Sequence, residues 1–130
     1  MKKDEIVKTL KEYFERREDV SMAFLFGSFF RGVEGQKSDI DVALYFKDEK
    51  DKMNVWCDLE RLLKKEVDVI VLNNAFPIIA WEAIRGIPLV IKDREKYLDY
   101  LLSVSWEAED LLDFNLDAFR MKEELQNVAR

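Results

Sequence analysis

Residues 20–46 read VSMAFLFGSFFRGVEGQKSDIDVALYF, two apolar runs separated by a glycine-containing polar segment. The apolar run over 20–26 predicts a buried strand that ends at Gly27, and the pattern over 39–46 predicts a second strand. The glycines and polar residues between the two strands are typical of a loop. Asp39 and Asp41 therefore stand inside a strand, where a carboxylate is costly to bury unless a cation meets it.

A third aspartate, Asp68, stands in the apolar run over 67–72, which predicts another strand. Strand side chains alternate between two faces, so Asp39 and Asp41 point to the same side of the sheet. Two carboxylates one strand step apart repel each other unless a cation lies between them, and hard oxygen ligands of this kind bind divalent metals. If the two strands are neighbours, all three carboxylates converge on one point.

The Gly27-Ser28 pair follows a strand and precedes a short helix or turn predicted over 28–33. Glycine lets the backbone approach a phosphate closely, the hydroxyl of Ser28 is a donor, and a helix N-terminus favours an anion. Alone, a Gly-Ser pair is most often a turn, and Asp68 alone is explained as a strand-end residue that faces solvent. The combination favours a two-metal site for phosphoryl or nucleotidyl transfer.

The remaining segments alternate between helical and extended patterns. Helical spacing covers 4–18 and 51–64, with Asp4 as a possible N-cap of the first. A helix over 75–85 is expected to be capped by Asn73 or Asn74 and to end at Gly86, and helical spacing resumes at residue 94. A short strand over 88–92 is placed at a sheet edge because Pro88 opens it.

This order of elements predicts an α/β (α+β) protein with a mixed four- or five-stranded sheet, flanking helices and a helical C-terminus. The length of 130 residues predicts one domain over 1–130, with a core at about 20–92 and a helical segment at about 94–130.

The composition narrows the chemistry. The chain has no histidine and one cysteine, Cys57, which excludes Ser-His-Asp triads, an internal disulfide and most zinc hydrolase designs. A net charge of −6 argues against a long nucleic-acid substrate. No apolar run approaches the roughly 20 residues that span a bilayer, and the N-terminus lacks the apolar core of a signal peptide. We therefore expect a cytoplasmic protein without a membrane partner.

The pair Gly27-Ser28, ten intervening residues, Asp39-Ile40-Asp41 and the later Asp68 together resemble the polymerase-beta-type nucleotidyltransferase superfamily. The run GSFFRG over 27–32 resembles its minimal nucleotidyltransferases, the MntA-like antitoxins. The resemblance covers about residues 20–92 and implies the polymerase-beta-like nucleotidyltransferase fold. It also implies ATP as the donor and Mg²⁺, two ions, bound by three carboxylates: Asp39, Asp41 and Asp68.

The same resemblance assigns roles to residues. Asp68 is expected to help activate the acceptor hydroxyl, while Gly27 and Ser28 are expected to lie at the phosphates. Two roles stay open for Arg31: it binds a phosphate, or it is a solvated or packing residue.

Members of this antitoxin group pair with a HEPN-domain ribonuclease toxin and adenylylate a tyrosine hydroxyl on it. The resemblance thus implies transfer of AMP from ATP to a partner HEPN toxin, with this chain as the antitoxin. Two alternatives stay open: transfer to a small hydroxylated molecule such as an aminoglycoside, and a non-catalytic antitoxin that neutralises by binding. Few residues follow the last predicted strand, which leaves little room for a domain that binds a small acceptor.

Overall fold

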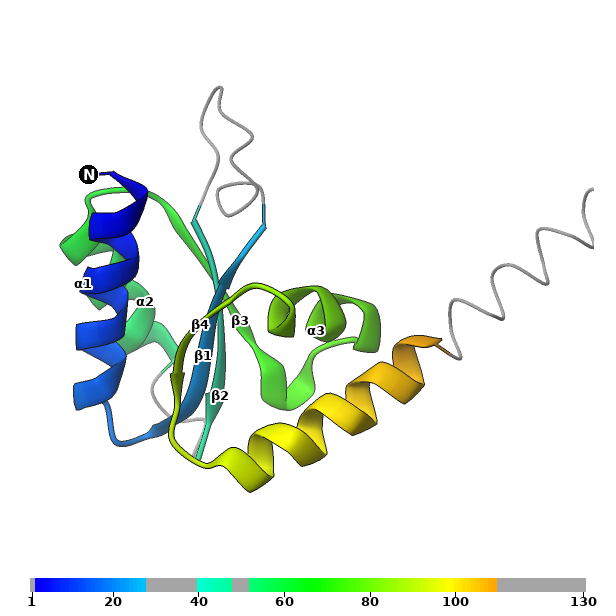
Figure 1. Cartoon of the computed structure of the whole chain (residues 1–130). Helices are drawn as coiled ribbons and strands as arrows, with labels where there is room; N and C mark the ends of the chain where they lie inside the picture. Colours follow the sequence, from blue (N-terminus) through cyan, green and yellow to red (C-terminus); the bar gives the residue numbers. More distant parts are fainter. Residues whose placement is uncertain (1, 28–39, 48–51, 110–130) are drawn as a thin grey trace, which may run out of the picture.

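The computed structural model describes residues 2–27, 40–47 and 52–109. Its centre is a four-stranded sheet in the order β3-β2-β1-β4 (Figure 1). The strands are β1 (Val20–Phe26), β2 (Ile40–Phe46), β3 (Val67–Val71) and β4 (Ile87–Ile91). β1 runs antiparallel to both of its neighbours, whereas β2 and β3 are parallel. The sheet is mixed, as the sequence predicted, and the described strand ends agree with the predicted ones to within one residue.

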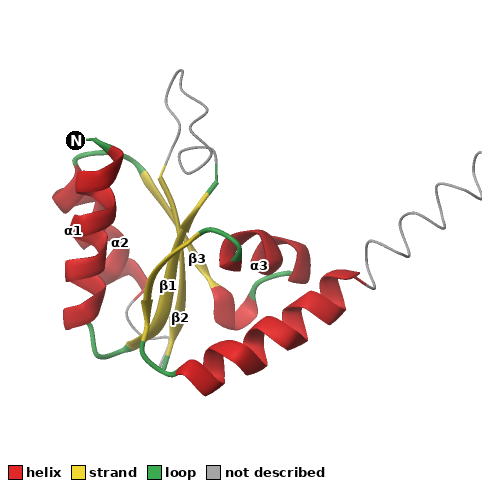
Figure 2. Cartoon of the chain, viewed as in Figure 1, coloured by secondary structure: helices red, strands yellow, loops and turns green. Residues whose placement is uncertain are grey.

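Helices cover both faces of the sheet (Figure 2). On one face lie α1 (Lys3–Arg16) and α2 (Lys52–Leu63). On the other lie α3 (Pro77–Ile84) and a further helix whose described part covers residues 94–109. Each pair of helices closes one hydrophobic core against the sheet.

The strand residues divide between these two cores with the period of two that strand geometry imposes. Leu25, Val42 and Leu44 belong to the core under α1 and α2. Phe26 and Ala43 belong to the core under α3. Because Asp41 stands two residues before Ala43 on β2, its side chain points to the α3 side of the sheet.

Two predicted helix caps are wrong. α1 begins after Lys2, with no side-chain cap, and Asp4 lies in its first turn, where a carboxylate still favours the helix dipole. Neither Asn73 nor Asn74 caps α3, because both lie in a short 3-10 helix, η2 (Leu72–Asn74), and the N-cap of α3 is Phe76. The Asn73 amide instead accepts a hydrogen bond from Phe46 N–H and donates one to Phe46 C=O, both 2.9 Å long.

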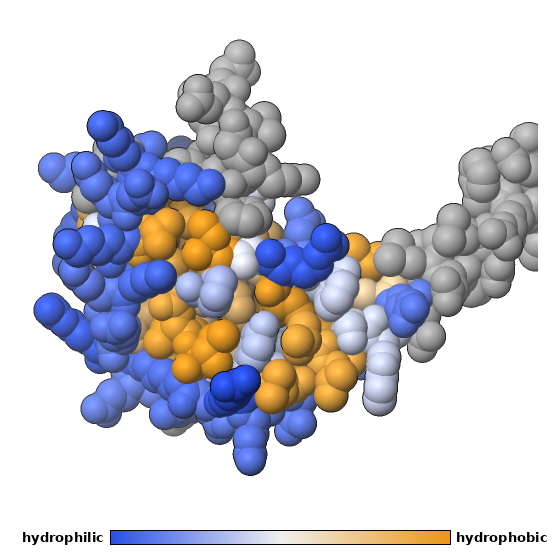
Figure 3. Space-filling view, in the orientation of Figure 1, coloured by the Kyte–Doolittle hydropathy of each residue, from blue (hydrophilic) through white to orange (hydrophobic). Residues whose placement is uncertain are grey.

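The helix over 94–109 packs on the same face of the sheet as α3, and it exposes a row of large hydrophobic side chains among charged ones. Tyr97 stacks on Phe24 at 6.0 Å between ring centroids, and the Tyr100 hydroxyl donates to Leu72 C=O at 2.8 Å. On the outer side of this helix, Figure 3 shows hydrophobic side chains at the surface. Leu98, Leu102 and Trp106 recur every fourth residue on this helix and are 43%, 52% and 66% exposed. None of the described helices is long and apolar enough to cross a membrane.

Candidate active site

Asp41 and Asp68 lie side by side on adjacent parallel strands. The β2–β3 register pairs them directly, and neighbouring strands lie about 4.8 Å apart. The two neighbours of Asp68 in the chain, Val67 and Val69, point into the core under α1 and α2. Because strand side chains alternate, Asp68 points to the α3 side, as Asp41 does. Asp41 is partly buried and Asp68 is exposed. The structure therefore brings these two predicted carboxylates together on one face of the sheet.

Gly27, the residue that follows β1, lies against the Asp41 carboxylate. The register pairs Phe26 with Asp41, and Gly27 is the next residue along. Its backbone has a φ of +87°, which side-chain-bearing residues rarely adopt, and a Cβ placed there would stand 2.1 Å from Oδ2 of Asp41. The sequence alone explains this glycine by the close approach of a phosphate to the backbone. The structure adds a second reason, which is room for the Asp41 carboxylate.

The other predicted site residues, Asp39, Ser28 and Arg31, lie outside the described residues. The three-carboxylate prediction therefore rests here on two of its members. In the part of the chain that the structure describes, no group of three potential metal ligands is found.

The donors that are described fit a hard divalent cation. Asp41 and Asp68 offer only carboxylate oxygens, which are the ligands that Mg²⁺ prefers. Two adjacent like charges also disfavour each other unless a cation neutralises them. The missing Cβ of Gly27 leaves the space that the Asp41 carboxylate fills, so the backbone is shaped around this carboxylate.

The end of α3 lies against the end of β1 at which Phe26 pairs with Asp41. A Cβ on Gly86 would stand 2.3 Å from Leu25 C=O and 2.9 Å from Cβ of Phe26. Gly86 was predicted as a helix end, and it follows Arg85, the C-cap of α3, but the close approach to β1 was not predicted. The sequence alone assigns no role to Arg85, because the contact that brings its neighbour Gly86 to the end of β1 is tertiary.

A second polar cluster lies in the helical layer on the opposite face and holds α1 to α2. The Tyr13 hydroxyl donates to Oδ2 of Asp58 at 2.7 Å, and Arg17 donates to both carboxylate oxygens of Asp19 at 2.9 and 3.0 Å. The Arg17 hydrogen bond holds the pKa of Asp19 below its usual range, and burial raises the pKa of Tyr13. Because this cluster belongs to the α1–α2 layer, we interpret it as structural.

The chain is similar in sequence to a known family and to named proteins. The family model described as "Polymerase beta, Nucleotidyltransferase" matches residues 8–95. A putative protein adenylyltransferase of Methanocaldococcus jannaschii is 35% identical over 66 residues, which are 48% of this chain and 71% of that protein. The protein adenylyltransferase MntA of Shewanella oneidensis is 25% identical over 87 residues. That match covers 65% of this chain but only 60% of the Shewanella protein.

Solved structures share the fold. A toxin–antitoxin structure with AMP-PNP superposes with a TM-score of 0.62 at 18% identity, covering 99% of this chain and 100% of that chain. A tri-AMPylated HEPN toxin of Shewanella oneidensis in complex with MNT antitoxin gives a TM-score of 0.58 at 16% identity. That match covers 95% of this chain and 99% of the other. At these identities the likeness establishes the fold alone.

Proposed function

The chain belongs to the polymerase beta nucleotidyltransferase family, and we propose that it transfers AMP from ATP to a hydroxyl group on a partner HEPN-domain toxin, for which it is the antitoxin. Two relatives named as protein adenylyltransferases support this proposal, as does the similarity to a solved structure of a tri-AMPylated HEPN toxin in complex with MNT antitoxin. We propose a tyrosine as the acceptor, and the cytoplasm, where ATP is available, as the place of action.

The observation that carries this proposal is the in-register pair of Asp41 and Asp68. With Asp39, they would hold two Mg²⁺ ions. When bound, the ions would neutralise phosphate charge and lower the pKa of the attacking hydroxyl. Gly27 and Ser28 would hold the phosphates through backbone and hydroxyl donors, and Arg31 would add a positive charge.

Asp68 is the exposed member of the pair, so an acceptor arriving from solvent meets it first. We propose that its carboxylate takes the proton of the attacking hydroxyl. The hydroxyl oxygen then bonds to the α-phosphorus of ATP, the bond from that phosphorus to the α–β bridging oxygen breaks, and pyrophosphate leaves.

Position-specific labelling of ATP tests this proposal. The chain, its HEPN partner and Mg²⁺ are incubated with ATP labelled either at the α- or at the γ-phosphate. We expect the α-label on the partner and the γ-label in pyrophosphate. Transfer of the γ-label would make the chain a kinase instead, and transfer of neither label would remove protein modification from the proposal.

One observation favours a protein acceptor over a small molecule. The exposed row of Leu98, Leu102 and Trp106 is an apolar surface of the kind that marks protein contacts. Release of pyrophosphate with a small alcohol and no partner would nevertheless favour the small-molecule alternative. If a variant with Asn at Asp39, Asp41 and Asp68 neutralises the toxin as well as the wild type does, binding alone explains the antitoxin.

A further inference from the structure

Arg85 is an exposed cation held in a defined place. Its guanidinium lies 5.5 Å from the centroid of the Trp81 ring, one helical turn earlier on α3. This ring is half-buried against the core under α3, and such a cation–π contact restricts an otherwise flexible side chain. Glu82, three residues earlier on α3, is exposed as well.

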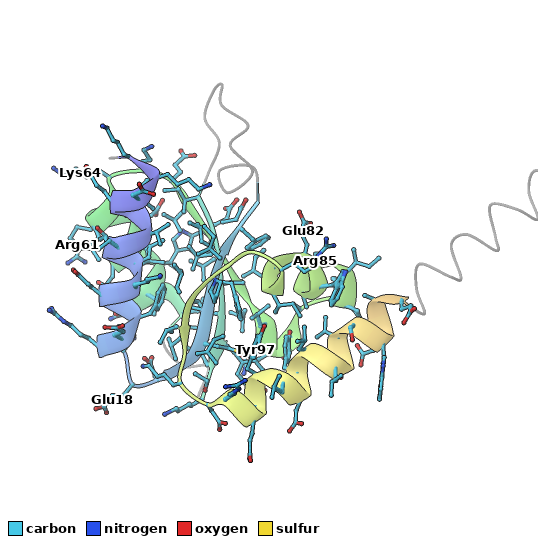
Figure 4. The ribbon with its side chains drawn as sticks, viewed as in Figure 1. Glu18, Arg61, Lys64, Glu82, Arg85 and Tyr97 are labelled. Carbon is cyan, nitrogen blue, oxygen red and sulfur yellow. The ribbon has the colours of Figure 1, made fainter. Side chains whose placement is uncertain are left out.

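Arg85 lies at the carboxylate end of the sheet. The next residue, Gly86, is pressed against Leu25 C=O and Cβ of Phe26, and Phe26 is the register partner of Asp41. Figure 4 shows Arg85 and Glu82 on α3, at the side where β1 ends, whereas Tyr97 lies further down the same face. The guanidinium therefore belongs to the face of the sheet toward which both carboxylates point.

The buried residues of α3 show that Arg85 is not on the side of the helix that packs on the sheet. Ala80, Ala83 and Ile84 are buried in the core under the helix. Trp81 and Arg85 share a different side of the helix, because residues four apart lie one above the other. A cation at a helix C-terminus also favours the helix dipole, which would account for Arg85 by stability alone. The experiment below separates these two roles.

We propose that Arg85, held by Trp81, binds the phosphates of the nucleotide donor, opposite the carboxylate pair. The observation that carries the proposal is a pre-positioned guanidinium on the same face and at the same end of the sheet as Asp41 and Asp68. Guanidinium groups bind phosphate oxygens through two parallel hydrogen bonds, a geometry that lysine lacks. This inference rests on the proposed function, because it takes a nucleoside triphosphate as the ligand.

Binding measurements without catalysis test it. Dissociation constants are measured for Mg²⁺-ATP and for Mg²⁺-pyrophosphate with the wild type, Arg85→Gln, Arg85→Lys and Arg61→Gln. Arg61 is the matched control, because it is an exposed arginine on α2, on the opposite side of the sheet (Figure 4). We expect Arg85→Gln to weaken both ligands roughly ten- to hundredfold, with a smaller loss for Arg85→Lys and no change for Arg61→Gln.

The outcomes are distinguishable from failure of the proposed function. If the wild type binds neither ligand, the proposed function itself fails. If the wild type binds both and Arg85→Gln binds them equally well, the assignment of Arg85 is overturned, even where its melting temperature falls. A loss confined to affinity for the protein acceptor overturns it too, because Arg85 would then serve the acceptor. If Trp81→Leu also weakens the binding of both ligands, the Trp81 ring holds Arg85 in its binding position.

Discussion

The Asp41 carboxylate occupies the space that a side chain on residue 27 would fill, so Gly27 and Asp41 depend on each other. Oδ2 of Asp41 lies 2.1 Å from the position of a Cβ on Gly27, far inside van der Waals contact. Gly27 also has a φ of +87°. Gly27, which follows β1, thus fixes the position of the Asp41 carboxylate on β2. The pairing of β1 with β2 therefore shapes this part of the site.

Gly27→Ala is expected to displace the Asp41 carboxylate. A displacement of about 1 Å in a reacting site costs on the order of 100-fold in rate, so we expect a loss of at least that size. The left-handed backbone adds about 1 kcal/mol of destabilisation. The rate of AMP transfer is measured beside a circular dichroism melt. A folded Gly27→Ala variant with wild-type turnover would contradict the role that we assign to this contact.

Mg²⁺ is expected to stabilise the wild-type protein and not Asp41→Asn. An ion that binds only the folded chain adds about 2.7 kcal/mol to the free energy of unfolding at a hundredfold excess over its dissociation constant. Urea unfolding with and without Mg²⁺ measures this difference. Asp99→Asn is the matched control, because Asp99 is an exposed aspartate on the helix over 94–109. Equal stabilisation of wild type and Asp41→Asn would place the ion elsewhere.

In metal-free protein, Asp68→Asn is expected to raise the free energy of unfolding slightly. Like charges on adjacent strands disfavour each other by about 0.2–1 kcal/mol, and the substitution removes one of them. The same variant is expected to lose AMP transfer. A variant that loses both activity and metal-free stability would instead identify Asp68 as a structural residue.

Asn73→Ala is expected to lower the free energy of unfolding by about 1–3 kcal/mol. The variant removes two hydrogen bonds to the backbone of Phe46 and leaves the partly buried amide and carbonyl groups unpaired. Asn54→Ala serves as the control, since the Asn54 side chain accepts one exposed bond from Arg17. Similar losses for the two variants in chemical denaturation would argue against a special role for Asn73.

Alkaline pH is expected to weaken the fold through Tyr100. Burial raises the pKa of Tyr100 to about 12 from its usual value of 10.0. Between these values the unfolded chain loses this proton while the folded chain keeps it, so the free energy of unfolding falls as pH rises from about 10 to about 12. Tyr100→Phe should flatten this fall by about 1 kcal/mol, after allowance for partial exposure.

Tyr13, whose pKa burial also raises, contributes in the same direction, so part of the fall remains in the Tyr100→Phe variant. A fall in stability identical to that of the wild type would show that the Tyr100 proton is not retained by the fold.

The sequence predicted the strands well because each is a short apolar run bounded by turn residues. It also predicted that Asp41 and Asp68 meet if their strands are neighbours, and the β2–β3 register confirms the meeting. It failed at Asn73, because the competing partner, Phe46, is distant in the chain and near only in the fold. It overlooked Arg85 for the same reason, since the contact of Gly86 with β1 is tertiary.

Nucleotidyl transfer by this chain is tested most directly by the intact mass of the HEPN partner. The partner is incubated with ATP, Mg²⁺ and each of three proteins: wild type, Asp41→Asn and Asp99→Asn. We predict that the partner gains one or more adenylyl groups with wild type and with Asp99→Asn, and none with Asp41→Asn. Two results would contradict the claim that the site at Asp41 and Asp68 performs nucleotidyl transfer. One is a partner that the wild type leaves unmodified, and the other is a partner that Asp41→Asn modifies as fully as the wild type does.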